Sequence, residues 1–147
     1  RQMCIRDRDV KWYLIGYGGE EPLIRQKIAE AGMQERVIIL GKKDNPYPYM
    51  RACDLYVQPS RYEGKAVTVR EAQLLGKPVV ITSYATSASQ LEDGVDGVIV
   101  PMDSAGCAAG IVALLRDPAR MQQLSENCAS RDYTNSAEIE KIYALME

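Results

Sequence analysis

Short runs rich in β-branched and aliphatic residues alternate with amphipathic stretches from Val10 to the end of the chain. This alternation is typical of βα units, in which helices join parallel strands. The runs expected to form strands are 11–16, 36–41, 54–57, 78–82 and 97–100, and we expect the first two to be buried. Helices are expected at 20–31, 50–53, 65–75, 104–115, 118–128 and 136–147. No internal repeat or linker divides residues 10–147, so the sequence predicts one α/β domain on a parallel sheet.

The composition limits the chemistry that such a domain can carry out. The 147 residues include 18 Lys and Arg against 20 Asp and Glu, a net charge of −2, so no nucleic-acid partner is expected. The absence of histidine excludes a Ser-His-Asp triad within the chain, and 4 cysteines without a C-x-x-C pair argue against a zinc site. Isolated cysteines, no signal peptide and no apolar run of roughly 20 residues together predict a cytoplasmic protein.

Ligands of open α/β sheets bind at the carboxyl ends of the strands. This rule points to three loops, at 16–22, 41–49 and 58–64. The first loop contains Gly16-Tyr17-Gly18-Gly19-Glu20-Glu21, in which Glu21 stands where the dinucleotide-binding fingerprint requires its third glycine. The residues alone leave two interpretations of this loop open, a glycine-rich turn and a ligand contact.

The third loop places polar groups directly before a predicted helix. Glu63 and Gly64 precede that helix and Lys65 begins it. The first amides of a helix lack intrahelical partners and favour an anion such as phosphate. Gly64 removes a side chain where a ligand would approach the backbone, and Lys65 adds a cation. The loop alone is equally compatible with a solvated turn.

Glu71 lies on the apolar stripe of the same predicted helix, beside Val67, Leu74 and Leu75. A carboxylate on such a stripe needs a partner, because burying an unpaired charge is costly. Arg70, Arg25 or a backbone donor would provide a purely structural partner. Two hydroxyl groups of a polar ligand would satisfy it equally well.

The spacing of Glu63 and Glu71 forms the E-x7-E pattern of the retaining "group 1" glycosyltransferases, family 4 of the sequence-based classification. Further segments resemble the C-terminal half of that family in order and spacing, namely Ser60-Arg61-Tyr62-Glu63-Gly64, Glu71-Ala72, Gly76-Lys77-Pro78-Val79-Val80 and Glu92-Asp93-Gly94 with Gly97-Val98-Ile99-Val100-Pro101. The resemblance covers residues 12–103, about two thirds of the chain. Asn45-Pro46-Tyr47-Pro48-Tyr49 and Glu63-Gly64-Lys65 are similar to members that build capsular polysaccharide or exopolysaccharide.

The resemblance implies a GT-B enzyme, in which two Rossmann-like domains face each other across a cleft. This chain would be the C-terminal, donor-binding domain, a Rossmann-like parallel β-sheet with flanking helices. Its substrate would be a nucleotide-diphosphate sugar, a UDP-sugar in preference to a GDP-sugar, and its acceptor a glycan or a lipid-linked glycan. The family resembles metal-independent enzymes, so no metal and no other cofactor is expected.

The resemblance also assigns roles to single residues. Glu63 would be the catalytic residue and hold the transferred sugar near its anomeric carbon, whereas Glu71 would bind the ribose hydroxyls. The helix-entrance amides would meet the diphosphate and sugar, the first glycine loop would leave room for the nucleotide, and the second loop would meet the base. The implied donor-binding residues are Gly16, Gly18, Gly41, Lys42, Gly64, Lys65, Ala66, Val67 and Glu71.

The chain also departs from the family pattern. Lys65 and Ala66 replace the more common aromatic residue and glycine. Residues 1–9 are polar and without periodicity, which predicts a linker or a non-native leader. The donor domain would then span 10–147 without its first strand and helix, where the family carries an Arg and a Lys that grip the diphosphate. We expect the acceptor-binding domain to be absent too, so that the isolated chain is inactive and any contact with the inner face of the plasma membrane is made by the missing half.

Two alternatives to a glycosyltransferase remain open, a nucleotide-sugar 2-epimerase and a non-catalytic nucleotide-sugar-binding module. The epimerase would need acid and base residues that the chain does not visibly supply. A receiver-like domain is disfavoured because the third strand runs into Val57-Gln58-Pro59 without a phosphoacceptor aspartate.

Overall fold

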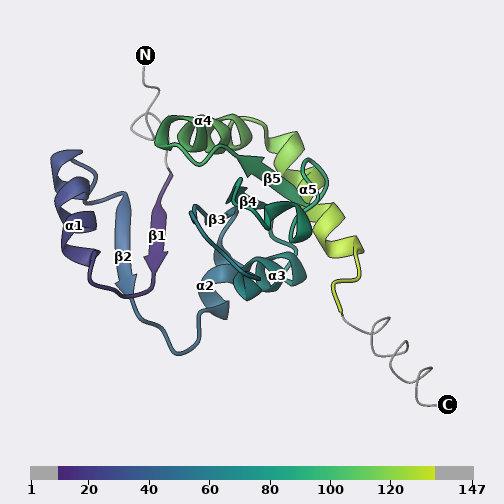
Figure 1. Ribbon diagram of the computed structural model, residues 1–147, viewed down its shortest axis with the longest axis horizontal. Coiled ribbons are helices and arrows are strands. Elements are labelled where there is room, and N and C mark those ends of the chain that lie inside the picture. The colour runs from purple at the N-terminus through teal and green to yellow at the C-terminus, as the bar shows by residue number, and fades with distance from the viewer. Residues whose placement is uncertain (1–9, 135–147) are drawn as a thin grey trace. The chain divides into compact units, whose positions relative to one another are not determined.

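The computed structural model describes residues 10–134, and the predicted helix at 136–147 and the predicted leader at 1–9 lie outside this range. The chain divides into two compact units, one up to Pro48 and one from Tyr49 onward. Each unit carries its own parallel sheet (Figure 1). The sequence predicts strands of one sheet, whereas the structure distributes them over two.

The first unit contains β1 (Trp12–Ile15), α1 (Glu21–Glu30) and β2 (Val37–Gly41). The strands pair in parallel, with Trp12 opposite Val37. Pro22 lies in the first turn of α1, where its missing N–H costs nothing, and Gly32 follows the C-terminal end of the helix with a φ of 64°.

The prediction that the first two strands are buried is wrong. Tyr13 and Ile15 of β1 are 51% and 38% exposed, β2 is half-buried throughout, and α1 has no buried residue. The physical reason is that a two-stranded sheet has too few neighbours to enclose a core of its own. Aliphatic composition therefore identified the strands without identifying their burial.

The second unit is built on β3 (Tyr56–Gln58), β4 (Val79–Thr82) and β5 (Gly97–Val100), parallel and in that order. Its helices are α3 (Val67–Leu74), α4 (Ser104–Leu115) and α5 (Pro118–Ser130), with a short 3₁₀ turn η2 (Ser87–Ser89) after β4. Helix α3 packs against β3 and β4 and contacts α5, and α4 packs against β5 and α5. Helix α2 (Tyr47–Ala52) spans the division between the units.

The core of this unit lies around the central strand β4, all four residues of which are buried. Val69 and Ala72 of α3 and Leu91 pack in the same cluster as Val79 and Ile81. Gly97 permits this packing, because a Cβ there would collide with the carbonyl oxygen of Val79 and the side chain of Leu91.

Helix starts differ from the expected ones for local reasons. Helix α2 begins at Tyr47, whose amide donates to Asn45 Oδ1 over 3.1 Å, and α3 begins at Val67 because the backbone of Ala66 is extended, with a ψ of 94°. Helix α4 begins where predicted, since the Asp103 side chain accepts from the Gly106 amide over 2.8 Å as an N-cap.

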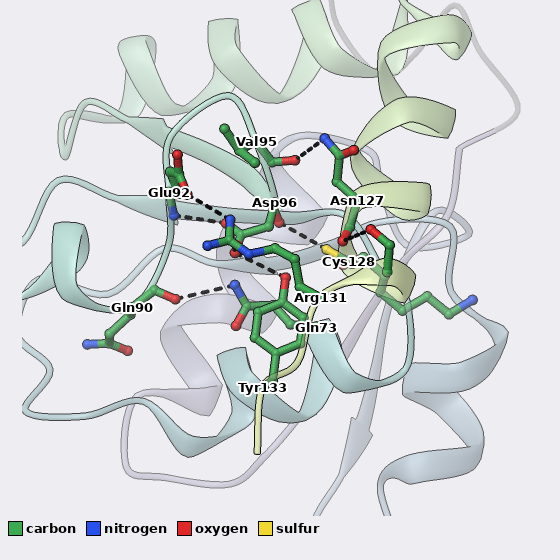
Figure 2. A network of polar contacts seen from close by, with 11 residues as sticks. Gln73, Gln90, Glu92, Val95, Asp96, Asn127, Cys128, Arg131 and Tyr133 are labelled. Atoms are coloured by element: carbon green, nitrogen blue, oxygen red, sulfur yellow. Dashed lines mark hydrogen bonds and ion pairs between the residues drawn. The ribbon is translucent and has the colours of Figure 1, made fainter. Parts of the chain in front are cut away.

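A buried polar cluster connects the loop before β5 to the end of α5 (Figure 2). At its centre Asp96 is 3% exposed, and its Oδ1 accepts from the Glu92 amide over 2.8 Å while its Oδ2 accepts from the Tyr133 hydroxyl over 3.0 Å. Arg131 Nη1 lies 3.4 Å from Asp96 Oδ2 and 2.8 Å from Glu92 Oε2. Burial raises the pKa of Tyr133, and Cys128 and Asp96 add to this effect. The hydroxyl therefore remains a donor throughout the neutral range.

None of the helices within residues 10–134 is both long enough and apolar enough to cross a membrane.

Candidate functional site

The loop between β3 and α3 carries Glu63, the residue to which the sequence assigns the chemistry. Its side chain is half-buried, and Oε1 accepts two hydrogen bonds, from Gln58 Nε2 over 2.8 Å and from Ser60 Oγ over 2.7 Å. Hydrogen bonds to a carboxylate are stronger than those between neutral groups. Glu63 is therefore held in one orientation by residues of its own loop and of β3.

Gln58 is in turn fixed by two hydroxyl groups. Its Oε1 accepts from Tyr56 Oη over 2.9 Å and from Thr68 Oγ1 over 2.8 Å. Burial raises the pKa of Tyr56, the hydrogen bond with Thr68 partly opposes this, and the charges of Glu71 and Glu63 add to the increase. Tyr56 accordingly stays protonated and keeps its donor role at neutral pH.

A second set of side chains holds the backbone of the loop. Thr86 Oγ1 donates to the carbonyl of Glu63 over 2.8 Å, and Gln90 Nε2 donates to the carbonyl of Gly64 over 3.3 Å. Gln90 Oε1 also accepts from the Ala66 amide over 2.8 Å. Ala66 supplies one of the helix-entrance amides expected at the ligand, and this amide is already bonded inside the protein. A diphosphate contact at Ala66 would require this bond to be exchanged.

The loop borders an open hollow of about 260 Å³ lined by Arg61, Tyr62, Glu63, Gly64 and Ala85. Tyr62 is 91% exposed, and Gly64 and Lys65 are exposed beside it. A Cβ on Gly64 would meet nothing within 4 Å. The structure therefore leaves room for a ligand next to the Glu63 carboxylate and provides a cation, Arg61, at the same place.

Glu71 is half-buried, but the stripe on which it lies is not the face that packs on the core. The buried residues of α3 are Val69, Ala72 and Gln73, whereas Val67 and Leu74 are 63% and 57% exposed. The expectation that this stripe faces the interior is wrong for Val67 and Leu74, whereas Leu75, at the C-terminal end of the helix, packs against the core.

Two of the structural partners considered for Glu71 are engaged elsewhere. Arg25 pairs with Glu21 in the first unit over 2.6 Å, and the Arg70 guanidinium lies 4.8 Å from the centroid of the Tyr133 ring.

The remaining candidate residues lie in the first unit. The Gly16 amide donates to the Gly41 carbonyl over 3.0 Å, so the structure brings these two glycines together, and φ is 147° at Gly16 and 70° at Gly41. Both positions favour glycine for backbone reasons alone. The Lys42 ammonium lies 5.5 Å from the centroid of the Tyr17 ring, and a Cβ on Gly18 would meet nothing within 4 Å.

Residues 10–134 contain no group of three or more His, Cys, Asp or Glu side chains placed to hold a metal ion.

Sequence reasoning identified Glu63 and its loop but missed the residues that hold them, Gln58, Thr86 and Gln90. Gln58 had one available signal, a polar residue ending a strand at the edge where ligands bind. Thr86 and Gln90 had none, because they lie 23 and 24 positions from their bonding partners.

The family described as "Glycosyl transferases group 1" matches residues 2–117. An alpha-D-kanosaminyltransferase of Streptomyces kanamyceticus is 30% identical over 131 residues, which are 87% of this chain and 34% of that protein. The lipopolysaccharide core biosynthesis mannosyltransferase LpsB of Rhizobium meliloti is 30% identical over 120 residues, 80% of this chain and 34% of LpsB. The chain thus spans about a third of the length of these two relatives.

Among solved structures, Anabaena Alr3699/HepE in complex with UDP is similar with a TM-score of 0.81 and 27% identity, over 93% of this chain and 40% of HepE. HepE in complex with UDP-glucose gives a TM-score of 0.79 and 26% identity over the same shares.

Proposed function

The chain belongs to the group 1 glycosyltransferases, and we propose that it forms the donor-binding part of a retaining enzyme that uses a nucleotide-diphosphate sugar. The sugar would pass to a glycan or a lipid-linked glycan acceptor. The observation that carries this proposal is the Glu63 carboxylate, held by Gln58 and Ser60 beside an open hollow at the carboxyl end of β3. The UDP and UDP-glucose complexes of HepE support UDP over GDP as the nucleotide.

In this proposal the donor lies along the entrance of α3. Glu63 faces the transferred sugar, and the diphosphate meets Gly64, Lys65 and the first amides of the helix, where the helix dipole favours negative charge. The Val67 amide is at this end of the helix. Ala66 contributes only if its bond to Gln90 is exchanged.

Glu71 is proposed to bind the ribose hydroxyls. It follows Val67 by four residues, which places it on the same side of the helix and about 6 Å further along its axis. A nucleoside diphosphate whose phosphates sit at the amides could therefore reach this carboxylate. In the first unit, Gly16 and Gly18 would leave space for the nucleotide, and the backbone at Gly41 and Lys42 would contact the base.

The transfer breaks the bond between sugar C1 and the diphosphate oxygen, and the electron pair leaves with the diphosphate. A bond forms between C1 and the acceptor oxygen, whose proton passes to the leaving diphosphate. Positive charge develops on the sugar ring and negative charge on the leaving group, so preorganised charges and dipoles supply most of the stabilisation. In this proposal the carboxylate of Glu63 stabilises the charge on the sugar ring, and the amide end of α3 stabilises the charge on the diphosphate.

We further propose that residues 10–147 act as one domain of a longer cytoplasmic enzyme whose other domain binds the acceptor. The first strand and helix of the donor domain, with their Arg and Lys, would belong to the same polypeptide. Similarity to named glycosyltransferases gives the epimerase alternative no support.

The proposal is tested by ligand-induced thermal stabilisation of the full-length polypeptide that contains these residues. UDP should raise its Tm by mass action, and more strongly than GDP. Glu71→Ala should reduce the UDP response by roughly tenfold in apparent affinity, the effect of losing hydrogen bonds to a charged group. Glu126→Ala is the matched control and should respond like the wild type, because this carboxylate accepts from Gln122 on the exposed side of α5. A protein stabilised by neither nucleotide would contradict the proposal, and an unchanged response in Glu71→Ala would remove the ribose assignment.

A further inference from the structure

The carboxamide of Gln58 connects three side chains, and its orientation is determined by their chemistry. The hydroxyls of Tyr56 and Thr68 both donate to Oε1, whereas Nε2 points at Glu63 Oε1. An ionised carboxylate only accepts hydrogen bonds. With the amide reversed, two oxygen acceptors would face each other across the 2.8 Å contact. The arrangement therefore places the two N–H donors of Gln58 on the side of Glu63.

The two donors to Glu63 reach the same oxygen. Gln58 Nε2 and Ser60 Oγ both bond Oε1, and no other residue within 10–134 bonds the Oε2 atom. Glu63 also lines the open hollow. One oxygen is thus used to hold the side chain, and the other is available to a donor group that enters the hollow.

We infer that Gln58 is a positioning residue, which holds Glu63 through Oε1 so that Oε2 is presented to the hydroxyl groups of the donor sugar. This inference rests on the proposed function. Tyr56 and Thr68 extend the same chain of hydrogen bonds, since they fix the amide that fixes the carboxylate. Gln58 itself lies behind the carboxylate and acts only through it.

The substitution that isolates this role is Gln58→Glu. The new carboxylate has nearly the same shape and still accepts from Tyr56 and Thr68, but it cannot donate to Glu63 and repels it. Gln122→Glu is the matched control, because Gln122 makes the same kind of bond, to Glu126 over 2.8 Å, on the exposed side of α5. The exchange variant Gln58→Glu/Glu63→Gln restores a hydrogen bond between the two positions with its polarity reversed.

The experiment measures the Kd of UDP and of UDP-glucose by titration calorimetry, with the Tm of each variant, on the full-length polypeptide. Gln58→Glu should weaken UDP-glucose binding roughly tenfold, the effect of a lost hydrogen bond to a charged group, and leave the Kd of UDP within about twofold of the wild type. Gln122→Glu should change neither constant. The exchange variant should recover the Tm lost in Gln58→Glu without recovering the affinity for UDP-glucose, because the group facing the sugar is no longer a carboxylate.

The outcomes separate the two hypotheses. If the wild type binds neither UDP nor UDP-glucose, the proposed function is wrong and this inference falls with it. If the wild type binds both and Gln58→Glu weakens neither ligand or both equally, the proposed function stands and the positioning role of Gln58 is refuted. An exchange variant that recovers sugar affinity with the Tm would show that only local packing matters, which also overturns the inference.

Discussion

Removal of the Asp96 carboxylate should strongly destabilise the second unit. Asp96→Ala leaves the Tyr133 hydroxyl without its acceptor in a position that is 9% exposed, and leaves the Glu92 amide without its side-chain acceptor. A buried donor without a partner costs about 1–3 kcal/mol. The Glu92 amide is partly accessible to water, so the loss of its acceptor should cost less. Together the two losses should lower the free energy of unfolding by roughly 3 kcal/mol.

Arg131 limits the loss of stability caused by Asp96→Ala. Its guanidinium keeps Glu92 Oε2 at 2.8 Å after Asp96 is removed, so no unpaired charge is left in the interior. Asp96→Asn should cost less, about 1–2 kcal/mol, because its side-chain oxygen still accepts from the Glu92 amide and only the acceptor of the Tyr133 hydroxyl is lost.

Urea unfolding of the wild type, of both Asp96 variants and of Asp54→Ala measures these differences through the transition midpoints. Asp54 is an exposed aspartate of the same unit and should change the stability by less than about 0.5 kcal/mol. If Asp96→Ala costs no more than Asp54→Ala, or if the Asn and Ala variants are equally unstable, the hydrogen-bond account of this cluster is refuted.

Two further predictions concern stability. Burial raises the pKa values of Cys128 and Cys53 above their ordinary 9.0. Above pH 9 these thiols therefore lose their protons more readily in the unfolded chain than in the folded one. The free energy of unfolding should fall by up to about 1.4 kcal/mol per pH unit for each group. Urea midpoints at pH 8 and pH 10 check this, and Cys128→Ala should flatten the decline, whereas a decline unchanged in that variant would exclude Cys128. Gly97→Ala should lower the free energy of unfolding by about 1–3 kcal/mol, because the added methyl group overpacks against Val79. Gly19→Ala, where a Cβ meets nothing within 4 Å, should be nearly neutral in the same urea experiment. A neutral Gly97→Ala would contradict the close packing of β5 on β4.

The sequence predicted those features that depend on neighbouring residues. Strand β5 and helix α4 begin and end as expected, and the start of α4 is set locally, because its cap Asp103 accepts from the amide of Gly106. Strands β1 and β2 were found by their aliphatic runs, but their burial was predicted wrongly. Burial depends on what covers a sheet, and that information does not reside in the strand itself.

The candidate site divides in the same way. Glu63 and Gly64 could be recognised because a polar loop between a strand and a helix is a local pattern. Gln90, which holds that loop, lies 24 residues from the Ala66 amide that it accepts, and only the packing of η2 beside the loop connects them. Sequence reasoning therefore identified the groups that would meet a ligand and missed those that hold them in place.

The assignment of Glu71 illustrates how a prediction can survive the loss of its first argument. The helical wheel suggested a carboxylate on the core side, which would need a ligand or an ion pair to offset its burial. In the structure the core side of α3 is formed by Val69 and Ala72, and the exposed Val67 shares the side of Glu71. Glu71 is therefore not on the core side of α3, and its assignment to the ribose depends on how far a ligand extends along the helix. A ligand bound at the amide end of α3 would meet the Glu71 carboxylate about one helical turn further on.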